Sequence, residues 1–135
     1  MIGSIFKNVD YIQKGLDATA LRNEVILNNI ANAETPDFKA SSVVFESVLK
    51  DAIEAEGKVK AKTTHKNHIA FSQSLDNISP VVVQNTDTTM RMDGNNVDID
   101  FQNAELAKNT INNTALIEKL NSEFSRLRMA IREGS

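Results

Sequence analysis

Apolar residues near the start of the chain recur every seven positions in two parallel rows. One row is Ile5, Ile12, Thr19, Ile26 and Ala33, and the other is Val9, Leu16, Asn23 and Ile30. These alternating steps of three and four residues, over about residues 9–33, predict an amphipathic helix of the coiled-coil type. We expect the helix to end near Asn32, because Pro36 disfavours helical geometry in the residue before it and because Asn tolerates a left-handed cap.

The C-terminal part, from Asp98 onward, carries the strongest helical pattern in the chain. Its two rows are Leu106, Asn113, Leu120 and Leu127, and Thr110, Ile117, Phe124 and Ile131. Either Asp98 or Asp100 is placed to cap the start of this helix. Arg126, Arg128 and Arg132 lie near its end, where positive charge interacts favourably with the helix dipole. The sequence therefore predicts a second long helix with its own apolar face.

The length of this second helix limits how the chain can fold. A helix of about 32 residues is about 48 Å long, whereas a compact domain of this size has a diameter of roughly 35 Å. One copy therefore cannot enclose the helix. Either the two terminal helices pair side by side into an elongated molecule, or other subunits cover their apolar rows.

The middle of the chain shows weaker and mixed patterns. Residues 34–42 predict a loop, and residues 43–56 recover helical spacing. From there to about residue 98, short β-prone pieces alternate with polar turns. The pieces are 69–71, 81–83 and 97–99.

Together these patterns predict a mainly α fold. Long N- and C-terminal helices form a coiled-coil-like pair, with a small, irregular and partly β insert between them. The expected segments are an N-terminal assembly helix at 1–33, a loop and short helix at 34–57, a variable insert at 58–97 and a C-terminal assembly helix at 98–135.

Composition narrows the classes of partner. The net charge is −3, so no basic surface is expected to bind nucleic acid or anionic lipid. The chain has no cysteine, which excludes disulfides, thiolate metal sites and cysteine nucleophiles. No apolar run approaches the roughly 18 residues that span a bilayer, and the first residues lack the features of a signal peptide. We expect neither direct membrane insertion nor a cleaved leader.

Two histidines are the first candidates for chemistry. His65 and His68 lie three residues apart, a spacing that would suit a metal on a helix. Lys62 and Lys66 beside them oppose a cation, however, and no cysteine or carboxylate completes a site. We interpret this segment as a solvated polar loop.

The stretch DGNNVDID at residues 93–100 superficially resembles a calcium-binding loop. Counted from Asp93, the sixth position is Asp98 instead of Gly and the twelfth is Ala104 instead of Glu. A turn at Gly94 followed by the start of a helix explains these residues better. No phosphate-binding glycine loop or nucleophile motif is present either. The sequence therefore predicts no enzyme activity, cofactor, metal or small-molecule substrate.

Asparagine recurs on or beside the apolar rows, where it is a mediocre helix former. The positions are Asn28, Asn29, Asn32, Asn109, Asn112 and Asn113. Two interpretations stay open: these side chains lie on exposed helix surface, or they form hydrogen bonds that set the register between packed helices.

The segment LRNEVILNNIANAETPDFKA, residues 21–40, resembles the signature of bacterial flagellar axial proteins, which include rod, hook and hook-associated proteins. Within that family, VVFESVLKDAI at 43–53 and GNNVDIDFQNAELAKNTINN at 94–113 resemble the proximal rod proteins. The sequence departs from the family pattern at Asp37, where Gly is common, at Gln102, where Glu is frequent, and at Asn113, where Tyr is frequent.

The resemblance implies a structural subunit of the flagellar basal-body rod that self-assembles through its terminal helices and is required for motility. It implies export through the flagellar type III apparatus, and partners that are other copies of the chain and other rod and basal-body proteins. The expected assembly residues are Ile12, Leu16, Ile26, Asn29, Ile30, Asn32, Thr35, Pro36, Phe38, Asn109, Asn113, Ile117, Leu120, Phe124, Leu127 and Ile131. The alternatives are another flagellar axial protein, a soluble helical adaptor or chaperone, and a small hydrolase that uses His65 or His68.

Overall fold

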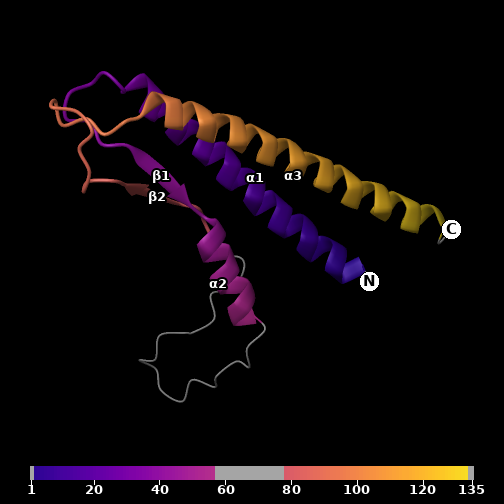
Figure 1. The fold of residues 1–135 in the computed structure, drawn as a ribbon. Helices are drawn as coiled ribbons and strands as arrows, with labels where there is room; N and C mark the ends of the chain where they lie inside the picture. Colours follow the sequence, from indigo (N-terminus) through magenta and orange to yellow (C-terminus); the bar gives the residue numbers. More distant parts are fainter. Residues whose placement is uncertain (1, 57–77, 134–135) are drawn as a thin grey trace, which may run out of the picture.

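Two long helices and a small middle region make up the fold (Figure 1). The computed structural model describes residues 2–56 and 78–133. Its elements are α1 (Ile2–Ala31), β1 (Ser41–Val44), α2 (Glu46–Glu56), β2 (Val81–Gln84) and α3 (Ile99–Glu133). The predicted mainly α fold, with long terminal helices around a partly β middle, is confirmed.

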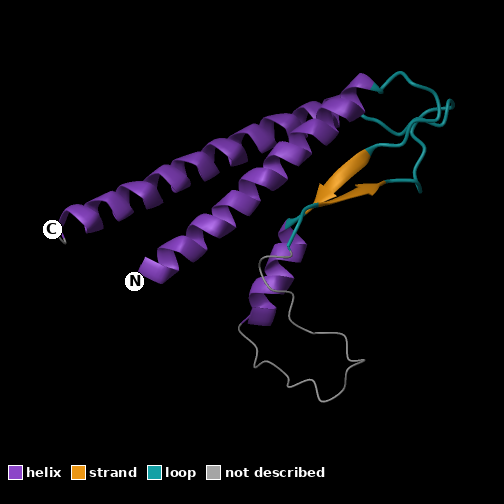
Figure 2. Cartoon of the chain, turned by 180° about the vertical axis from the view of Figure 1, so that it is seen from behind, coloured by secondary structure: helices purple, strands orange, loops and turns teal. Residues whose placement is uncertain are grey.

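Helices α1 and α3 lie side by side and antiparallel, so that both chain ends lie at the same end of the molecule (Figure 2). At 1.5 Å per residue they are about 45 Å and about 52 Å long. The first of the two expected arrangements, pairing within one chain, is the one that the molecule adopts. Within residues 2–56 and 78–133, no helix has the length and apolar content needed to cross a bilayer.

One of the two N-terminal rows forms the buried side of α1. Its members Ile12, Thr19, Ile26 and Ala33 are all buried, whereas Val9, Leu16 and Ile30 of the other row are half-buried and Asn23 is exposed. The helix starts at Ile2, before the periodic stretch, and ends at Ala31, one residue before the expected end. The predicted left-handed cap at Asn32 is wrong, because Asn32 does not have a positive φ. Its side chain donates back to the Asn28 carbonyl at 2.8 Å.

Strands β1 and β2 form a two-stranded antiparallel sheet in which Ser41 faces Gln84 and Val44 faces Val81. The predicted β piece at 81–83 is confirmed. The prediction that Val43 and Val44 belong to a helix is wrong, because β2 offers these β-branched residues a partner strand, and α2 begins only at Glu46. Local spacing of three and four residues did not reveal that partner.

A small apolar core joins α1, α2 and the residue that leads into β2. Its buried members are Ala18, Phe45, Ala52 and Ile78, with Val48 and Leu49 packed against them. Two of the four buried members are alanines, so the core holds few large side chains. Contact between α1 and α3 therefore carries much of the fold.

The predicted β piece at 97–99 is wrong, because Val97 and Asp98 lie in no strand and Ile99 is the first residue of α3. The Asp98 carboxylate accepts hydrogen bonds from the backbone N–H groups of Asp100, at 3.0 Å, and Phe101, at 3.1 Å. Asp98 is therefore the N-cap of α3, as one of the two expected alternatives had it. The predicted piece at 69–71, and the two histidines at 65 and 68, lie outside the described residues.

Two residues with positive φ bring the turns before β1 and before α3 together. Asp37 has φ 59° and Gly94 has φ 80°, and the Asp37 N–H donates to the Asp93 carbonyl at 2.9 Å. A Cβ atom on Gly94 would lie 2.4 Å from the Asp37 carboxylate oxygen. The expected turn at Gly94 is confirmed, and the residue that departs from the family's common Gly occupies a left-handed conformation that suits Gly.

We predict that Gly94→Ala lowers the free energy of unfolding by about 2 kcal/mol, through its positive φ and its clash with Asp37. In an Asp37→Gly background the same change should cost clearly less, because the clashing oxygen is gone while the backbone strain stays. Urea denaturation of the four proteins measures both costs. Equal costs in the two backgrounds would show that the two turns are not coupled through this contact.

Candidate assembly surface

Asn29 joins three elements through one buried amide. Its Nδ2 donates to the Ser41 carbonyl at 2.7 Å and its Oδ1 accepts from the Ser41 N–H at 3.0 Å. The same Nδ2 donates to Oε1 of Gln102 at 3.2 Å. Asn29 is 1% exposed, so these partners replace its water. The side chain fixes the first residue of β1 against α1 and α3.

The side chain of Asn95, in the turn before α3, binds the turn that follows α1. Its Nδ2 donates to the carbonyls of Asn32, at 3.0 Å, Ala33, at 3.0 Å, and Thr35, at 2.8 Å. Its Oδ1 accepts from the Val97 N–H at 2.7 Å. These carbonyls belong to the turn that follows α1, which ends at Ala31, and a residue about sixty positions away satisfies them. Sequence analysis missed Asn95, because nothing near it in the sequence signals this distant role.

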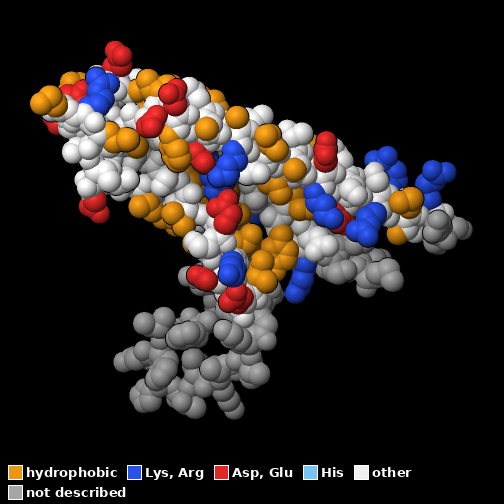
Figure 3. Space-filling model, viewed as in Figure 1, with side chains coloured by type: hydrophobic (Ala, Val, Ile, Leu, Met, Phe, Trp, Pro, Cys, Tyr) orange, Lys and Arg blue, Asp and Glu red, His pale blue; other side chains and the backbone are white. Residues whose placement is uncertain are grey.

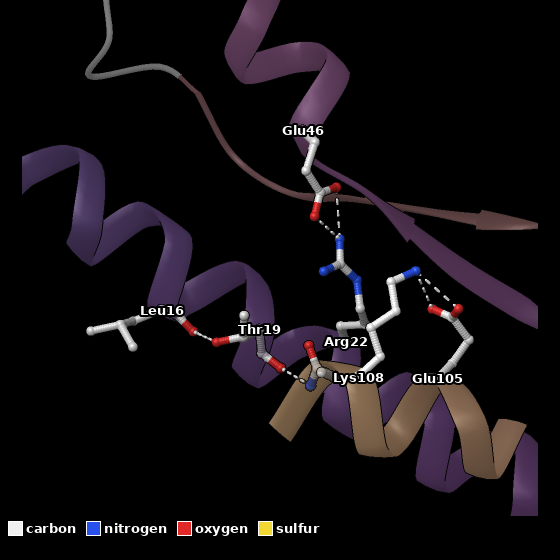
Figure 4. A network of polar contacts seen from close by, with 7 residues as sticks. Leu16, Thr19, Arg22, Glu46, Glu105 and Lys108 are labelled. Atoms are coloured by element: carbon white, nitrogen blue, oxygen red, sulfur yellow. Dashed lines mark hydrogen bonds and ion pairs between the residues drawn. The ribbon is translucent and has the colours of Figure 1, made fainter. Parts of the chain in front are cut away.

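Two asparagines of α3 bind one threonine of α1. Nδ2 of Asn109 donates to the Thr19 carbonyl at 2.9 Å, and Nδ2 of Asn113 donates to Oγ1 of Thr19 at 2.8 Å. The Thr19 hydroxyl donates in turn to the Leu16 carbonyl at 2.8 Å, as Figure 4 shows. These bonds form in a single alignment of the two helices, so they set the register of the pair.

The two interpretations of the asparagines thus divide by position. Hydrogen bonds between elements are confirmed for Asn29, Asn109 and Asn113, whereas Asn28 and Asn112 are exposed. The side chain of Asn32 bonds to Asn28 and Thr35, within its own stretch of chain. Helical spacing alone does not separate these cases.

An ion pair ties α2 to α1 (Figure 4). Nη2 of Arg22 donates to both carboxylate oxygens of Glu46, at 2.7 and 2.8 Å. Burial raises the pKa of Glu46, but hydrogen bonds from Arg22 and from backbone N–H groups, together with the Arg22 charge, outweigh it and leave the pKa below its usual value. On α3, Lys108 pairs with Glu105 at 3.1 Å. Sequence analysis identified neither pair.

Glu123 is a buried carboxylate on the α1-facing side of α3. It is 1% exposed, and its Oε1 pairs with Lys119 at 3.5 Å and Arg126 at 3.3 Å. Its Oε2 is buried and has no hydrogen-bond partner. Burial of a carboxylate with one oxygen unpaired costs stability. Glu123 therefore weakens the helix pair toward the end where both chain termini lie. The apolar pattern of the sequence did not reveal this buried charge.

Only one of the two predicted rows of α3 packs on α1. Leu106, Asn113, Leu120 and Leu127 of the first row are half-buried. The second row, Thr110, Ile117, Phe124 and Ile131, is exposed and lies beside the first row. Ile117 and Phe124 each keep 45% of their surface. We call this second set the outer row.

The expected assembly residues fall into three groups. Ile12, Ile26, Asn29 and Asn109 are buried; Leu16, Ile30, Asn32, Phe38, Asn113, Leu120 and Leu127 are half-buried; Thr35, Pro36, Ile117, Phe124 and Ile131 are exposed. The first group packs within this chain, whereas the last group is accessible on its surface. Within the described residues, no cluster of three His, Asp or Glu side chains is placed to hold a metal.

Comparison with known proteins finds relatives from several bacteria that carry the same name. The chain is 35% identical over 126 residues to the flagellar basal body rod protein FlgB of Bacillus subtilis, covering 93% of this chain and 94% of that protein. It is 37% identical over 108 residues to FlgB of Borreliella burgdorferi, covering 76% and 79%, and 28% identical over 127 residues to FlgB of Salmonella typhimurium, covering 91% of each. No protein-family model matches the chain.

We predict that Asn29→Ala lowers the free energy of unfolding by about 2 to 4 kcal/mol, because it leaves the Ser41 backbone groups and Gln102 without partners. Asn28→Ala is the matched control: it makes the same change one residue earlier, at an exposed position, and should stay within about 0.5 kcal/mol of wild type. Thermal or urea denaturation measures both. Equal losses in the two variants would contradict the assigned role of Asn29.

Proposed function

Because the chain belongs to the FlgB family of flagellar basal body rod proteins, we propose that it forms part of the proximal rod and packs against neighbouring subunits through the outer row of α3. Membership in this family makes it a structural component of the flagellar basal body, where it contacts other basal-body components and supports flagellum-dependent motility.

The exposed outer row is the observation that carries the packing proposal. Ile117 and Phe124 are seven residues apart on one side of a helix of 35 residues. Full burial of such side chains stabilises a protein by about 1.5 to 3 kcal/mol each. Because both are partly exposed in the isolated chain, a partner that covers them would gain part of this free energy. A regularly spaced apolar row on an exposed helix is typical of a surface that another helix covers.

Family membership also indicates which other proteins the chain meets. Its neighbours are other copies of itself and other rod proteins, and the flagellar type III apparatus exports it in unfolded form without cleaving a leader. The small core, the polar residues between α1 and α3, and the unpaired Glu123 oxygen support this, since each lowers the cost of unfolding. The role is non-enzymatic, which accords with relatives that are named as rod proteins. A soluble adaptor would instead form a small complex with one partner and stay out of basal bodies.

We predict that Phe124→Asp abolishes motility and removes the chain from purified basal bodies, because neighbouring subunits would have to bury its charge. Its effect on the unfolding free energy of the isolated chain should be about 1 kcal/mol, since Phe124 is 45% exposed there. Ser125→Asp adds the same charge at the next, exposed position outside the outer row and should swim normally. Normal swimming and rod assembly of Phe124→Asp would refute the packing proposal.

A further inference from the structure

An apolar groove lies on the side of the helix pair where α2 joins it. Its volume is about 460 Å³. One stretch of α1, residues 11–22, forms its length, with α2 and α3 on either side. Figure 3 shows hydrophobic side chains gathered where α2 meets the helix pair. The lining residues used below are Ile12, Gly15, Phe45, Leu49, Ala115 and Leu116.

The length of the groove matches the spacing of the outer row. Residues 11–22 of α1 extend over about 16 Å, and the seven-residue step from Ile117 to Phe124 covers about 10 Å. Both side chains therefore fit along one groove. At its middle, Gly15 carries no side chain, and an added Cβ would already lie 3.2 Å from Leu116. The absence of a side chain there lets Leu116 of the same chain pack closely against α1.

The charges of the two surfaces are complementary. Between Glu46 and Glu54, α2 has three carboxylates and one lysine. Arg22 of α1 also lines the groove and pairs with Glu46, so this side has a net charge of −1. Residues 124–132 of α3 have three arginines and no acidic residue, a net charge of +3. Figure 3 shows Asp and Glu side chains around α2 and Arg and Lys side chains toward the C-terminal end of α3. A helix that brings the outer row into the groove also brings these arginines toward α2.

The groove and the outer row lie on different sides of α3. Ala115 lines the groove and Ile117 belongs to the outer row, and two residues correspond to about 200° around a helix. A copy that offers its outer row to one neighbour thus keeps its own groove open for another. Such head-to-tail contacts do not close between two copies, and they propagate into a ring or an open helical assembly.

We infer that the groove between α2 and α3 of one copy binds the C-terminal half of α3 from a second copy, with Ile117 and Phe124 inserted. The inference rests on the proposed rod function and names its self-association site. It gives α2 a role as one wall of the binding groove. A subunit that lacks either surface would interrupt the assembly at that point.

Cysteine cross-linking tests this inference directly, since the chain has no cysteine of its own. The test variant carries Ala115→Cys in the groove and Asn121→Cys beside the outer row; both positions are exposed. Within one chain they are about 9 Å apart along the helix and on different sides, beyond the roughly 7 Å limit for a disulfide. Any disulfide therefore joins two copies. The control pairs Ala115→Cys with Ser122→Cys, which is exposed and away from the outer row.

Basal bodies from cells with each variant as the sole copy are oxidised and run on non-reducing gels. We expect the test variant to form multiples of the chain mass at least tenfold more than the control. The purified chain at high concentration should form the same multiples of the chain mass. This second measurement still tests the contact if the cysteines reduce assembly in cells. A test variant that remains monomeric in both settings would overturn the inference. Absence of the wild-type chain from basal bodies would overturn the rod function, and this inference with it.

Discussion

The amide of Asn29 is the interaction on which the rest of the fold depends. It pairs with both backbone groups of Ser41 and with the side chain of Gln102, so a single side chain positions β1 and α3 relative to α1. A buried amide costs free energy unless its donors and acceptors have partners. The position of β1 sets that of β2 across the sheet, and Phe45, the residue after β1, brings α2 into the small core.

Polar residues between α1 and α3 give the helix pair a defined register at the expense of stability. Asn109 and Asn113 both bind Thr19, whereas a longer apolar contact would have buried more surface and tolerated sliding. Toward the end where both chain termini lie, Glu123 has a buried carboxylate oxygen without a hydrogen-bond partner. The apolar side chains that could have strengthened the pair lie on the outer row instead. The chain is thus aligned internally by polar contacts and leaves an apolar row exposed.

Particular elements show how far local pattern reaches. Spacing of three and four residues predicted both long helices, and the place before the periodic stretch predicted a cap at either Asp98 or Asp100, of which the structure uses Asp98. It misassigned Val43 and Val44, whose strand conformation depends on pairing with residues about forty positions later. Local spacing also did not reveal the roles of Asn95 and Glu123. Asn95 binds carbonyls in the turn after α1, about sixty residues away. Glu123 is a charged residue that is buried although the pattern gives no reason to expect it.

The sequence by itself determined the two helices, their amphipathic faces, the turn at Gly94 and, through the resemblance at residues 21–40, the flagellar family. These follow from interactions among residues within a few positions of one another, or from a contiguous motif. Only the tertiary structure decided which row of α3 packs on α1, which asparagines are buried, and that α2 and α3 border a groove. Each of these depends on the angle and register at which distant segments meet, and those are set by hydrogen bonds such as those of Asn29 and Asn109 between residues far apart in the chain.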